Sequence, residues 1–274
     1  LSAKSNWVFV RVESDGYAGL GEATLYGWEK LQLVYLEQLS ASLVGLSVEQ
    51  ALKQVRVQPG SPGGLVASSV ISALEQALTD VRARSQGRPL YATLGPAQRT
   101  SIRMYANINR RTENRTPAGF VASARDAVAQ SYKAVKIAPF DGVVPDELGS
   151  AESRARIDAG IERIYATRGA IGPDVDLLVD CHWRFDEATA ASVLRELEAA
   201  KLFWFECPIP ESSETYPALA RLRSLAHRFG TRLAGAEQQI GVAGFRPFIE
   251  GGLLDVVMPD LKYAGGYAEI LRIA

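Results

Sequence analysis

Short apolar segments alternate with amphipathic stretches through the second part of the chain, from about residue 101 onward. The apolar segments recur roughly every 25 to 45 residues, and the stretches between them carry hydrophobic residues at the spacing of a helix. Such alternation is typical of repeated β-strand and α-helix units whose strands pair in parallel. Six strands are predicted, centred on residues 102–105, 135–137, 177–179, 203–205, 233–234 and 256–258.

The number of strands is the next constraint on the fold. A closed α/β barrel of the TIM type needs eight strands, and six parallel strands left open would expose unpaired edges. The helix after the sixth strand is cut short at Ala274. We therefore expect a (β/α) barrel domain over residues 101–274, truncated after strand six, with strands seven and eight not in the sequence.

Residues 1–100 have a different pattern, which is typical of a mixed α+β domain. Residues 7–13 read as a strand, Asp15-Gly16 as its turn, and a second strand ends near Glu22. Helical periodicity follows over residues 31–43, 48–55 and 66–84. Because the first residue is Leu1, we expect this domain to be incomplete at its N-terminus.

The composition excludes several classes of partner. Thirty basic and 31 acidic side chains leave a formal charge of −1 without any run of Lys and Arg, so neither nucleic acid nor an anionic membrane surface is expected. No apolar run approaches the roughly 18 residues of a membrane-spanning helix, and no signal-peptide pattern is present. We expect a cytoplasmic protein with a small-molecule ligand. The two cysteines, Cys181 and Cys207, are too few for a disulfide framework or a structural zinc site and are expected to be reduced.

Four consecutive predicted strands end in an acidic residue, in chain order Asp180, Glu206, Glu237 and Asp260. The carboxyl ends of the strands carry the active site in parallel barrels. Taken singly, each acid reads as a helix cap or a solvated loop residue. Taken together, carboxylates that converge on the barrel axis repel one another unless a hard cation neutralises them. Mg²⁺ bound through carboxylate oxygens meets that need.

These strand ends resemble those of the enolase superfamily, in its mandelate racemase-like branch. Residues 258–266 (MPDLKYAGG) are similar to the family's sixth strand end and are the most specific match. Weaker matches are residues 17–23 (YAGLGEA) with the capping domain, the Gly63-Gly64 loop, and residues 88–95 (RPLYATLG) with the lead-in to the barrel. The resemblance covers almost the whole chain and implies a TIM-type barrel with an N-terminal α+β capping domain.

The resemblance also implies a set of site residues. Asp180, Glu206 and Glu237 correspond to the three Mg²⁺ ligands of the superfamily. Asp260 corresponds to an Asp that orients and charges a His at the end of strand seven, and the two form a base dyad. Strand seven, and with it that His, is expected to lie beyond Ala274.

Strand two departs from the commonest family pattern. The family usually has Lys-x-Lys there, with the second Lys as a base, whereas this chain has Lys136-Ile137-Ala138. Ala138 cannot take a proton. Lys136 remains as a catalytic candidate, because a cation beside the substrate carboxylate stabilises charge that develops on its oxygens. The alternative is a solvent-exposed Lys at the end of a strand.

The chain has two histidines. His182, two residues after Asp180, resembles the acid/base His of sugar-acid dehydratases in this superfamily, some of which also lack the second Lys of strand two. An imidazole can protonate a leaving hydroxyl at physiological pH. The alternative is a His that only supports a metal ligand from behind. His227 falls in a predicted helix well before strand six and reads as a surface or packing residue.

The function implied by the resemblance is that of a Mg²⁺-dependent lyase, which removes the proton α to a carboxylate and dehydrates a sugar acid to a 2-keto-3-deoxy acid. Three alternatives stay open: a racemase or epimerase of a 2-hydroxy acid, a non-catalytic metal-binding relative, and an unrelated barrel. A homo-oligomer is implied by the family alone. Residues 26–28 and 60–64 are candidates for a substrate-covering lid, although Tyr26 and Trp28 read equally well as packing aromatics.

Overall fold

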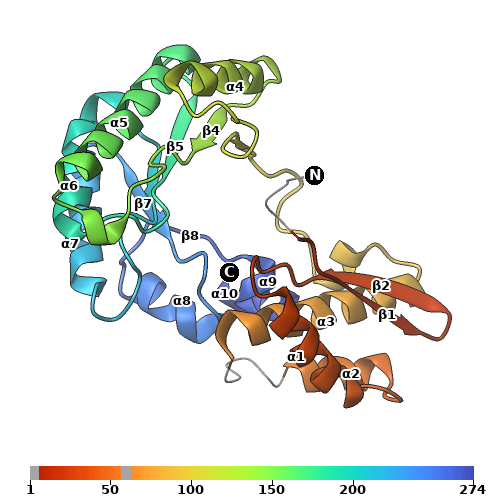
Figure 1. Cartoon of the computed structure of the whole chain (residues 1–274). Coiled ribbons are helices and arrows are strands. Elements are labelled where there is room, and N and C mark those ends of the chain that lie inside the picture. The colour runs from red at the N-terminus through yellow and green to blue at the C-terminus, as the bar shows by residue number, and fades with distance from the viewer. Residues whose placement is uncertain (1–5, 57–62) are drawn as a thin grey trace. The chain divides into compact units, whose positions relative to one another are not determined.

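The computed structural model describes residues 6–56 and 63–274, and Figure 1 shows their helices and strands. The chain forms two compact units. The cap unit contains Leu1–Ser101, Glu237–Pro247 and Met258–Ala274, and the sheet unit contains Ile102–Ala236 and Phe248–Val257. Two C-terminal segments thus group with the first hundred residues, so neither unit is continuous in sequence. The division into domains at residues 100 and 101 stays a prediction.

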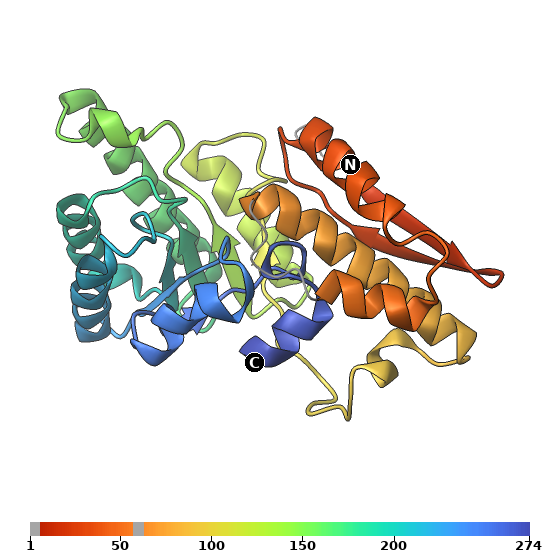
Figure 2. The ribbon, with the colours of Figure 1, turned by 90° about the horizontal axis from the view of Figure 1, so that it is seen from below.

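A β-hairpin forms the N-terminal part of the cap unit. β1 (Phe9–Ser14) pairs antiparallel with β2 (Tyr17–Glu22). The turn between them, Asp15-Gly16, has φ of 51° and 80°, a left-handed conformation that Asp and Gly tolerate. Gly19 and Gly21 allow the hairpin to lie directly on α3 (Gly64–Ser85), because a Cβ at these positions would lie 2.1 Å and 1.9 Å from helix carbonyl oxygens. Figure 2 shows the hairpin along this helix.

Helices complete the cap unit. The three helices predicted from periodicity are confirmed as α1 (Glu29–Ala41), α2 (Val48–Arg56) and α3. Val70 and Leu74 of α3 belong to an apolar core that includes Val10 and Leu52. A 3-10 turn, η1 (Leu90–Thr93), follows α3, and two later helices also belong to this unit, α9 (Leu261–Ala264) and α10 (Tyr267–Ile273).

Hydrogen bonds attach α9 and α10 to α3. Ser68 Oγ donates to the carbonyl oxygen of Tyr263 at 2.6 Å, and the N–H of Tyr267 donates to Glu75 Oε2 at 2.9 Å. Glu75 is a carboxylate with only 1% of its surface exposed, so this hydrogen bond at the start of α10 is made in the interior. The same segments lie side by side in Figure 2.

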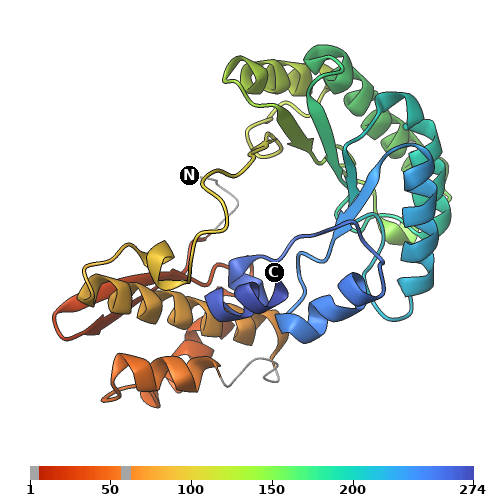
Figure 3. The ribbon, with the colours of Figure 1, turned by 180° about the vertical axis from the view of Figure 1, so that it is seen from behind.

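Six parallel strands form the sheet unit, and each pairs with the next along the chain. They are β3 (Ala106–Asn107), β4 (Ala134–Ile137), β5 (Asp176–Asp180), β6 (Trp204–Glu206), β7 (Arg232–Gly235) and β8 (Val256–Val257). Between them come α4 (Pro117–Ala129), η2 (Pro145–Glu147), α5 (Ala151–Ile171), α6 (Glu187–Glu196), η3 (Glu198–Ala200), α7 (Tyr216–Arg228) and α8 (Gly241–Glu250). Figures 1 and 3 show α4 to α7 along one side of the sheet.

The alternation of strands and helices predicted from the sequence is confirmed, and with it the fold class. A small antiparallel sheet lies in the N-terminal part, and six parallel strands follow, as in a truncated barrel. The first predicted strand is wrong in position, since pairing begins at Ala106, opposite Val135, and not at residues 102–105. Ile102 and Met104 are 78% and 65% exposed, so their apolar side chains are not part of a core.

Burial explains why the strands of the sheet unit read as continuous apolar runs. β4 is buried at every position, and β5 is buried from its second residue onward. Parallel strands that are covered on both faces lack the alternating pattern of a half-exposed strand. Cys181 and Cys207 are both buried, and neither takes part in a disulfide. In residues 6–56 and 63–274, no helix is both long and apolar enough to cross a membrane.

Candidate active site

The carboxyl ends of β4, β5 and β6 bring three charged side chains together. Asp180 and Glu206 are partners in the register of β5 and β6, and Lys136 lies on β4. Lys136 Nζ is 2.6 Å from Glu206 Oε1 and 4.0 Å from Asp180 Oδ2. The exposed fractions of the three residues are 5% for Lys136, 6% for Asp180 and 0% for Glu206. Lys136 is therefore not the solvent-exposed strand-end lysine of the alternative interpretation.

Aromatic side chains surround this cluster. Trp204, on the same face of β6, donates its indole N–H to Glu206 Oε2 at 2.8 Å. The Lys136 ammonium lies 5.4 Å from the centre of the Tyr105 ring. Both oxygens of Glu206 therefore have a donor, one from Trp204 and one from Lys136, and the carboxylate is held in a single orientation.

The cluster of Lys136, Asp180 and Glu206 contains two carboxylates and one ammonium, so the formal charge of these three side chains is negative. Burial alone would lower the pKa of Lys136, but Glu206, and to a lesser degree Asp180, raise it above its ordinary value. Lys136 is therefore a fixed positive charge. The remaining negative charge and the hard oxygen donors of Asp180 and Glu206 fit a divalent cation such as Mg²⁺.

The thiol of Cys181, next to Asp180, does not contribute a nucleophile. Burial raises its pKa well above the ordinary value, and the charges of Asp180 and Glu206 raise it further. A thiol kept protonated in this way is chemically inert.

His182 folds back onto Asp180. Its backbone N–H donates to Asp180 Oδ1 at 3.0 Å, and its ring Nε2 lies 2.9 Å from Asp180 Oδ2. The side chain is 40% exposed, whereas that of Asp180 is 8% exposed. One edge of the imidazole thus contacts a candidate metal ligand while much of the ring stays accessible to a small molecule.

Left-handed backbone conformations cluster where these strands end. His182 and Trp183 after β5, Cys207 after β6 and Ala236 after β7 have φ of 51°, 55°, 45° and 66°. Residues other than glycine rarely adopt such values, and strained positions of this kind gather at active sites. No local sequence pattern singles out these four positions, because the surrounding structure enforces the conformation.

Glu211 is a further residue of this end of the sheet unit that the sequence did not single out. It lies in the loop after β6, and its Oε1 accepts the backbone N–H of Ala236 at 3.0 Å. The only sequence signal was an acid five residues after Glu206, which is a weak one in a polar loop.

Glu237 and Asp260 belong to the cap unit. Glu237 directly follows Ala236, the last residue of the longer segment of the sheet unit. Asp260 is the N-cap of α9, where its Oδ1 accepts the N–H of Lys262 at 2.8 Å. Its Oδ2 lies 3.4 Å from Lys262 Nζ, which is also 3.8 Å from Glu22 Oε1. Asp260 therefore has the helix-capping geometry that the simpler interpretation predicted, together with an ion pair.

Several acidic side chains of the cap unit lie near the phenol of Tyr263. Burial raises the pKa of its phenol, although the charge of Lys262 lowers it. Three carboxylates raise this pKa further: Asp260, Glu237 and Glu22. The structure thus groups Lys136, Asp180, His182 and Glu206 in one unit and Glu237 with Asp260 in the other. Across the described parts of the chain, no three His, Cys, Asp or Glu side chains form a group that could hold a metal ion.

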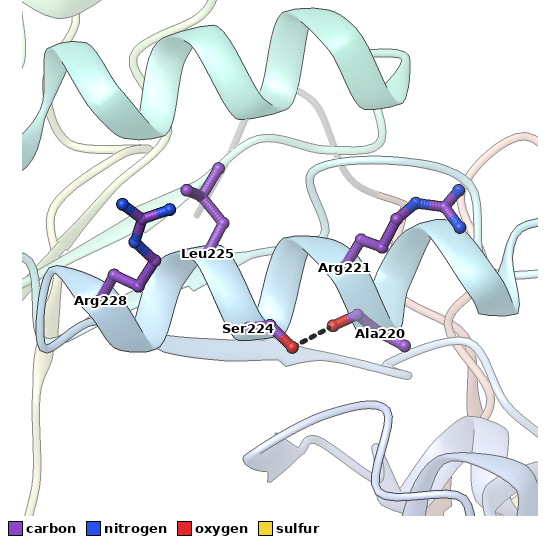
Figure 4. Close-up of a pocket in the computed structure, with 5 residues that line it drawn as sticks. All are labelled: Ala220, Arg221, Ser224, Leu225 and Arg228. Carbon is purple, nitrogen blue, oxygen red and sulfur yellow. Dashed lines mark hydrogen bonds between the residues drawn. The ribbon is translucent and has the colours of Figure 1, made fainter.

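His227 lies near the end of α7, at the opposite end of the sheet from the carboxylate cluster. Its Nε2 is 2.9 Å from both oxygens of Asp255, the residue before β8, so its reading as a surface or packing residue is consistent with the structure. A pocket on the same helix is lined by Ala220, Arg221, Ser224, Leu225 and Arg228 (Figure 4). It contains none of the candidate site residues.

The proposed lid segments belong to the cap unit. Tyr26 and Trp28 are 68% and 51% exposed, so neither is a packing residue of the cap core. In the second segment, residues 60–62 lie outside the described residues, and Gly63 is the N-cap of α3.

Comparison with known families covers nearly the whole chain. Residues 119–274 match the family model "Enolase C-terminal domain-like", and residues 2–95 match "Mandelate racemase / muconate lactonizing enzyme, N-terminal domain". Two curated relatives are named D-galactonate dehydratase. The protein from Verminephrobacter eiseniae is 31% identical over 273 residues, which are 98% of this chain and 68% of the relative. The one from Xanthomonas axonopodis pv. citri is 30% identical over 277 residues, 99% of this chain and 69% of the relative.

Solved structures agree with this assignment. A mandelate racemase/muconate lactonizing enzyme from Jannaschia sp. CCS1 aligns with a TM-score of 0.83 at 26% identity, over 97% of this chain and 71% of that one. A member of the enolase superfamily from Salmonella Typhimurium aligns with a TM-score of 0.81 at 27% identity, over 98% and 73%. The chain is therefore an enzyme that belongs to the mandelate racemase / muconate lactonizing enzyme family of the enolase superfamily.

Proposed function

We propose that this enzyme dehydrates a sugar acid to a 2-keto-3-deoxy acid, with Mg²⁺ held by Asp180, Glu206 and Glu237. The observation that carries the proposal is the buried cluster of Lys136, Asp180 and Glu206 at the carboxyl ends of three adjacent parallel strands. Metal dependence comes with membership of the superfamily. The identity of the metal and its ligands belongs to the proposal.

The chemistry requires positive charge beside the substrate carboxylate. A proton α to a carboxylate is very weakly acidic, and its removal places a second negative charge on the same group. When bound, Mg²⁺ acts as a Lewis acid toward the substrate carboxylate. Lys136 adds a fixed positive charge that requires no reorganisation during the reaction, since it is already buried and hydrogen-bonded to Glu206.

His182 is the proposed acid for the second step. Once the α-proton has left, the C–O bond to the β-hydroxyl breaks, and His182 gives its proton to that hydroxyl so that water departs. The resulting enol tautomerises to the 2-keto product. The ring's 40% exposure leaves room for a hydroxyl to approach, and its contact with Asp180 limits its rotation.

Asp260 has the proposed role of orienting and charging the base that takes the α-proton. Its Oδ1 is fixed by the cap hydrogen bond to Lys262, which supports a single side-chain orientation. No second Lys is available on β4, because the position two residues after Lys136 is Ala138. This absence favours dehydration over racemisation, which needs a base on each face of the substrate.

We base the proposed substrate class on the names of the relatives. The relatives from Verminephrobacter eiseniae and Xanthomonas axonopodis pv. citri are among those named D-galactonate dehydratase, so aldonic acids related to D-galactonate are the first candidates. We also propose a homo-oligomeric assembly and a cytoplasmic location.

Deuterium exchange followed by NMR tests the proposed function. The full chain is incubated in D₂O with Mg²⁺ and a panel of sugar acids, and the α-proton and any keto product are followed. We expect loss of the α-proton signal together with a 2-keto-3-deoxy product. Exchange without that product would favour a racemase or epimerase. Bound Mg²⁺ with neither exchange nor product from any acid would favour a non-catalytic relative.

A further inference from the structure

The loop after β6 places a carboxylate against the end of β7. Glu211 Oε1 accepts the backbone N–H of Ala236 at 3.0 Å. The pairing of β6 with β7 ends at Glu206 and Ala234, followed by one hydrogen bond from the Cys207 N–H to the Ala234 carbonyl. The N–H of Ala236 therefore lies beyond the β6–β7 ladder, and Glu211 supplies the acceptor that a strand no longer provides.

The backbone at this contact has an unusual conformation. Ala236 is fully buried and has φ of 66°, a value that a residue with a Cβ adopts only when its surroundings enforce it. Its neighbour Gly235 contacts the same carboxylate, since a Cβ built at Gly235 would lie 2.0 Å from Glu211 Oε1. Glu211 thus occupies the space that a side chain at Gly235 would need, and it also accepts the hydrogen bond from Ala236.

We propose that Glu211 is a positioning residue, which holds the Gly235-Ala236 turn and thereby sets the direction in which the chain presents Glu237. Ala236 is the residue immediately before Glu237, so its φ determines where the following residue begins. The inference rests on the proposed function, in which Glu237 is a metal ligand. Residues that orient metal ligands typically change metal affinity by about 10- to 100-fold when they are removed.

Mn²⁺ binding, followed by the EPR signal of the free ion, tests this role on the full chain. We expect Glu211→Ala to weaken Mn²⁺ binding about tenfold or more. Glu211→Gln retains an oxygen that can accept the Ala236 N–H and is expected to bind within about threefold of wild type. Glu214→Ala is the matched control, because Glu214 is an exposed acid of the same loop, and it should leave binding unchanged.

Gly235→Ala provides a second variant that does not remove the carboxylate. The new methyl group collides with Glu211, so Mn²⁺ binding should weaken, whereas Gly235→Ala combined with Glu211→Ala should bind no more weakly than Glu211→Ala alone. Thermal denaturation of the metal-free variants is measured in parallel. A lower Tm with unchanged Mn²⁺ affinity would show a purely structural role and overturn the proposal.

Two further outcomes separate this proposal from the proposed function. If wild type binds Mn²⁺ and Asp180→Ala abolishes that binding, the metal site stands, and an unaltered affinity in Glu211→Ala rejects the positioning role alone. Equal losses in Glu211→Gln and Glu211→Ala would mean that the negative charge of Glu211, and not its hydrogen bond with Ala236, supports binding, which would overturn the positioning role. Absence of Mn²⁺ binding by wild type would reject the metal site and the positioning role together.

Discussion

The two ends of the parallel sheet differ in the ratio of carboxylates to the cations that contact them. At the carboxyl end, the buried carboxylates of Asp180 and Glu206 share the Lys136 ammonium. His182 also contacts Asp180, and the Trp204 indole N–H donates to Glu206. At the amino end, Asp255 alone receives the Arg223 guanidinium at 2.7 Å, the His227 ring at 2.9 Å and the Leu233 N–H at 2.9 Å. The amino end thus pairs one carboxylate with one guanidinium. The carboxyl end places two carboxylates beside one ammonium, an arrangement that fits the divalent cation of the proposed function.

Replacement of Lys136 should have the largest effect on activity. In Lys136→Met the fixed positive charge beside the substrate carboxylate is lost, and we expect kcat to fall about 10²- to 10³-fold. The variant should also be destabilised without metal, because two buried carboxylates then face each other, and Mg²⁺ should restore much of the lost Tm. Turnover assays and thermal denaturation with and without Mg²⁺ measure both effects. A Tm that falls equally in both conditions would make Lys136 structural, like Arg223.

His182→Asn should reduce dehydration by about a hundredfold, the typical contribution of a general acid. Exchange of the α-proton should persist, because His182 acts after that proton has left. Mg²⁺ affinity separates this role from its alternative. If His182 only supports Asp180, the affinity should drop about tenfold and exchange should be lost together with dehydration.

At the amino end, Asp255→Asn should lower the free energy of unfolding by about 2 kcal/mol, the scale of hydrogen bonds to a charged group. It should leave kcat and Mg²⁺ affinity unchanged, since Asp255 precedes β8 at the end away from the cluster. Urea denaturation and turnover assays test this pair of expectations. A loss of activity without a loss of stability would contradict the contrast between the two ends.

Ionisation of Asp255 should make the free energy of unfolding depend on pH in the acidic range. Burial raises the pKa of this carboxyl, but the Leu233 N–H, Arg223 and His227 together lower it below its ordinary value of 3.8. A lowered pKa means that the folded state binds the proton less readily than the unfolded state, so the stabilisation is complete above pH 3.8 and is lost as the pH falls further. The difference in urea midpoint between wild type and Asp255→Asn should therefore be constant near neutral pH and shrink near pH 3.

The smallest effect is expected at the exposed pair of Arg221 and Glu187 on the outer helices. The pair is bidentate, with distances of 2.6 Å and 2.8 Å, but the two side chains are 63% and 38% exposed. Exposed ion pairs contribute little, so Arg221→Ala should change neither stability nor turnover measurably. Because Arg221 also lines the pocket of Figure 4, reduced turnover in this variant would point to a role for that pocket.

The sequence predicted the features that depend on local pattern. Buried parallel strands produce apolar runs of recognisable length, and an acid such as Asp180 or Glu206 at the end of such a run is visible in one dimension. The first strand was misplaced because Ile102 and Met104 are apolar yet exposed, and hydrophobicity alone cannot distinguish the two situations.

Other features of the site depend on contacts between distant residues. The ion pair of Lys136 with Glu206 joins positions 70 residues apart, and the hydrogen bond from Ala236 to Glu211 joins positions 25 apart. The left-handed backbone of Ala236 and Cys207 has no residue-type signature, because the surrounding structure enforces it. The same is true of the difference between the two ends of the sheet, since Asp255 looks no different from Asp180 in sequence.

Titration calorimetry with Mg²⁺ tests the contrast between the two ends most directly, using the full-chain wild type, Asp180→Ala and Asp255→Asn. We expect saturable binding by wild type, loss of that binding in Asp180→Ala, and unchanged affinity in Asp255→Asn. Binding that survives in Asp180→Ala, or that disappears in Asp255→Asn, would contradict the assignment of the carboxyl end as the metal site.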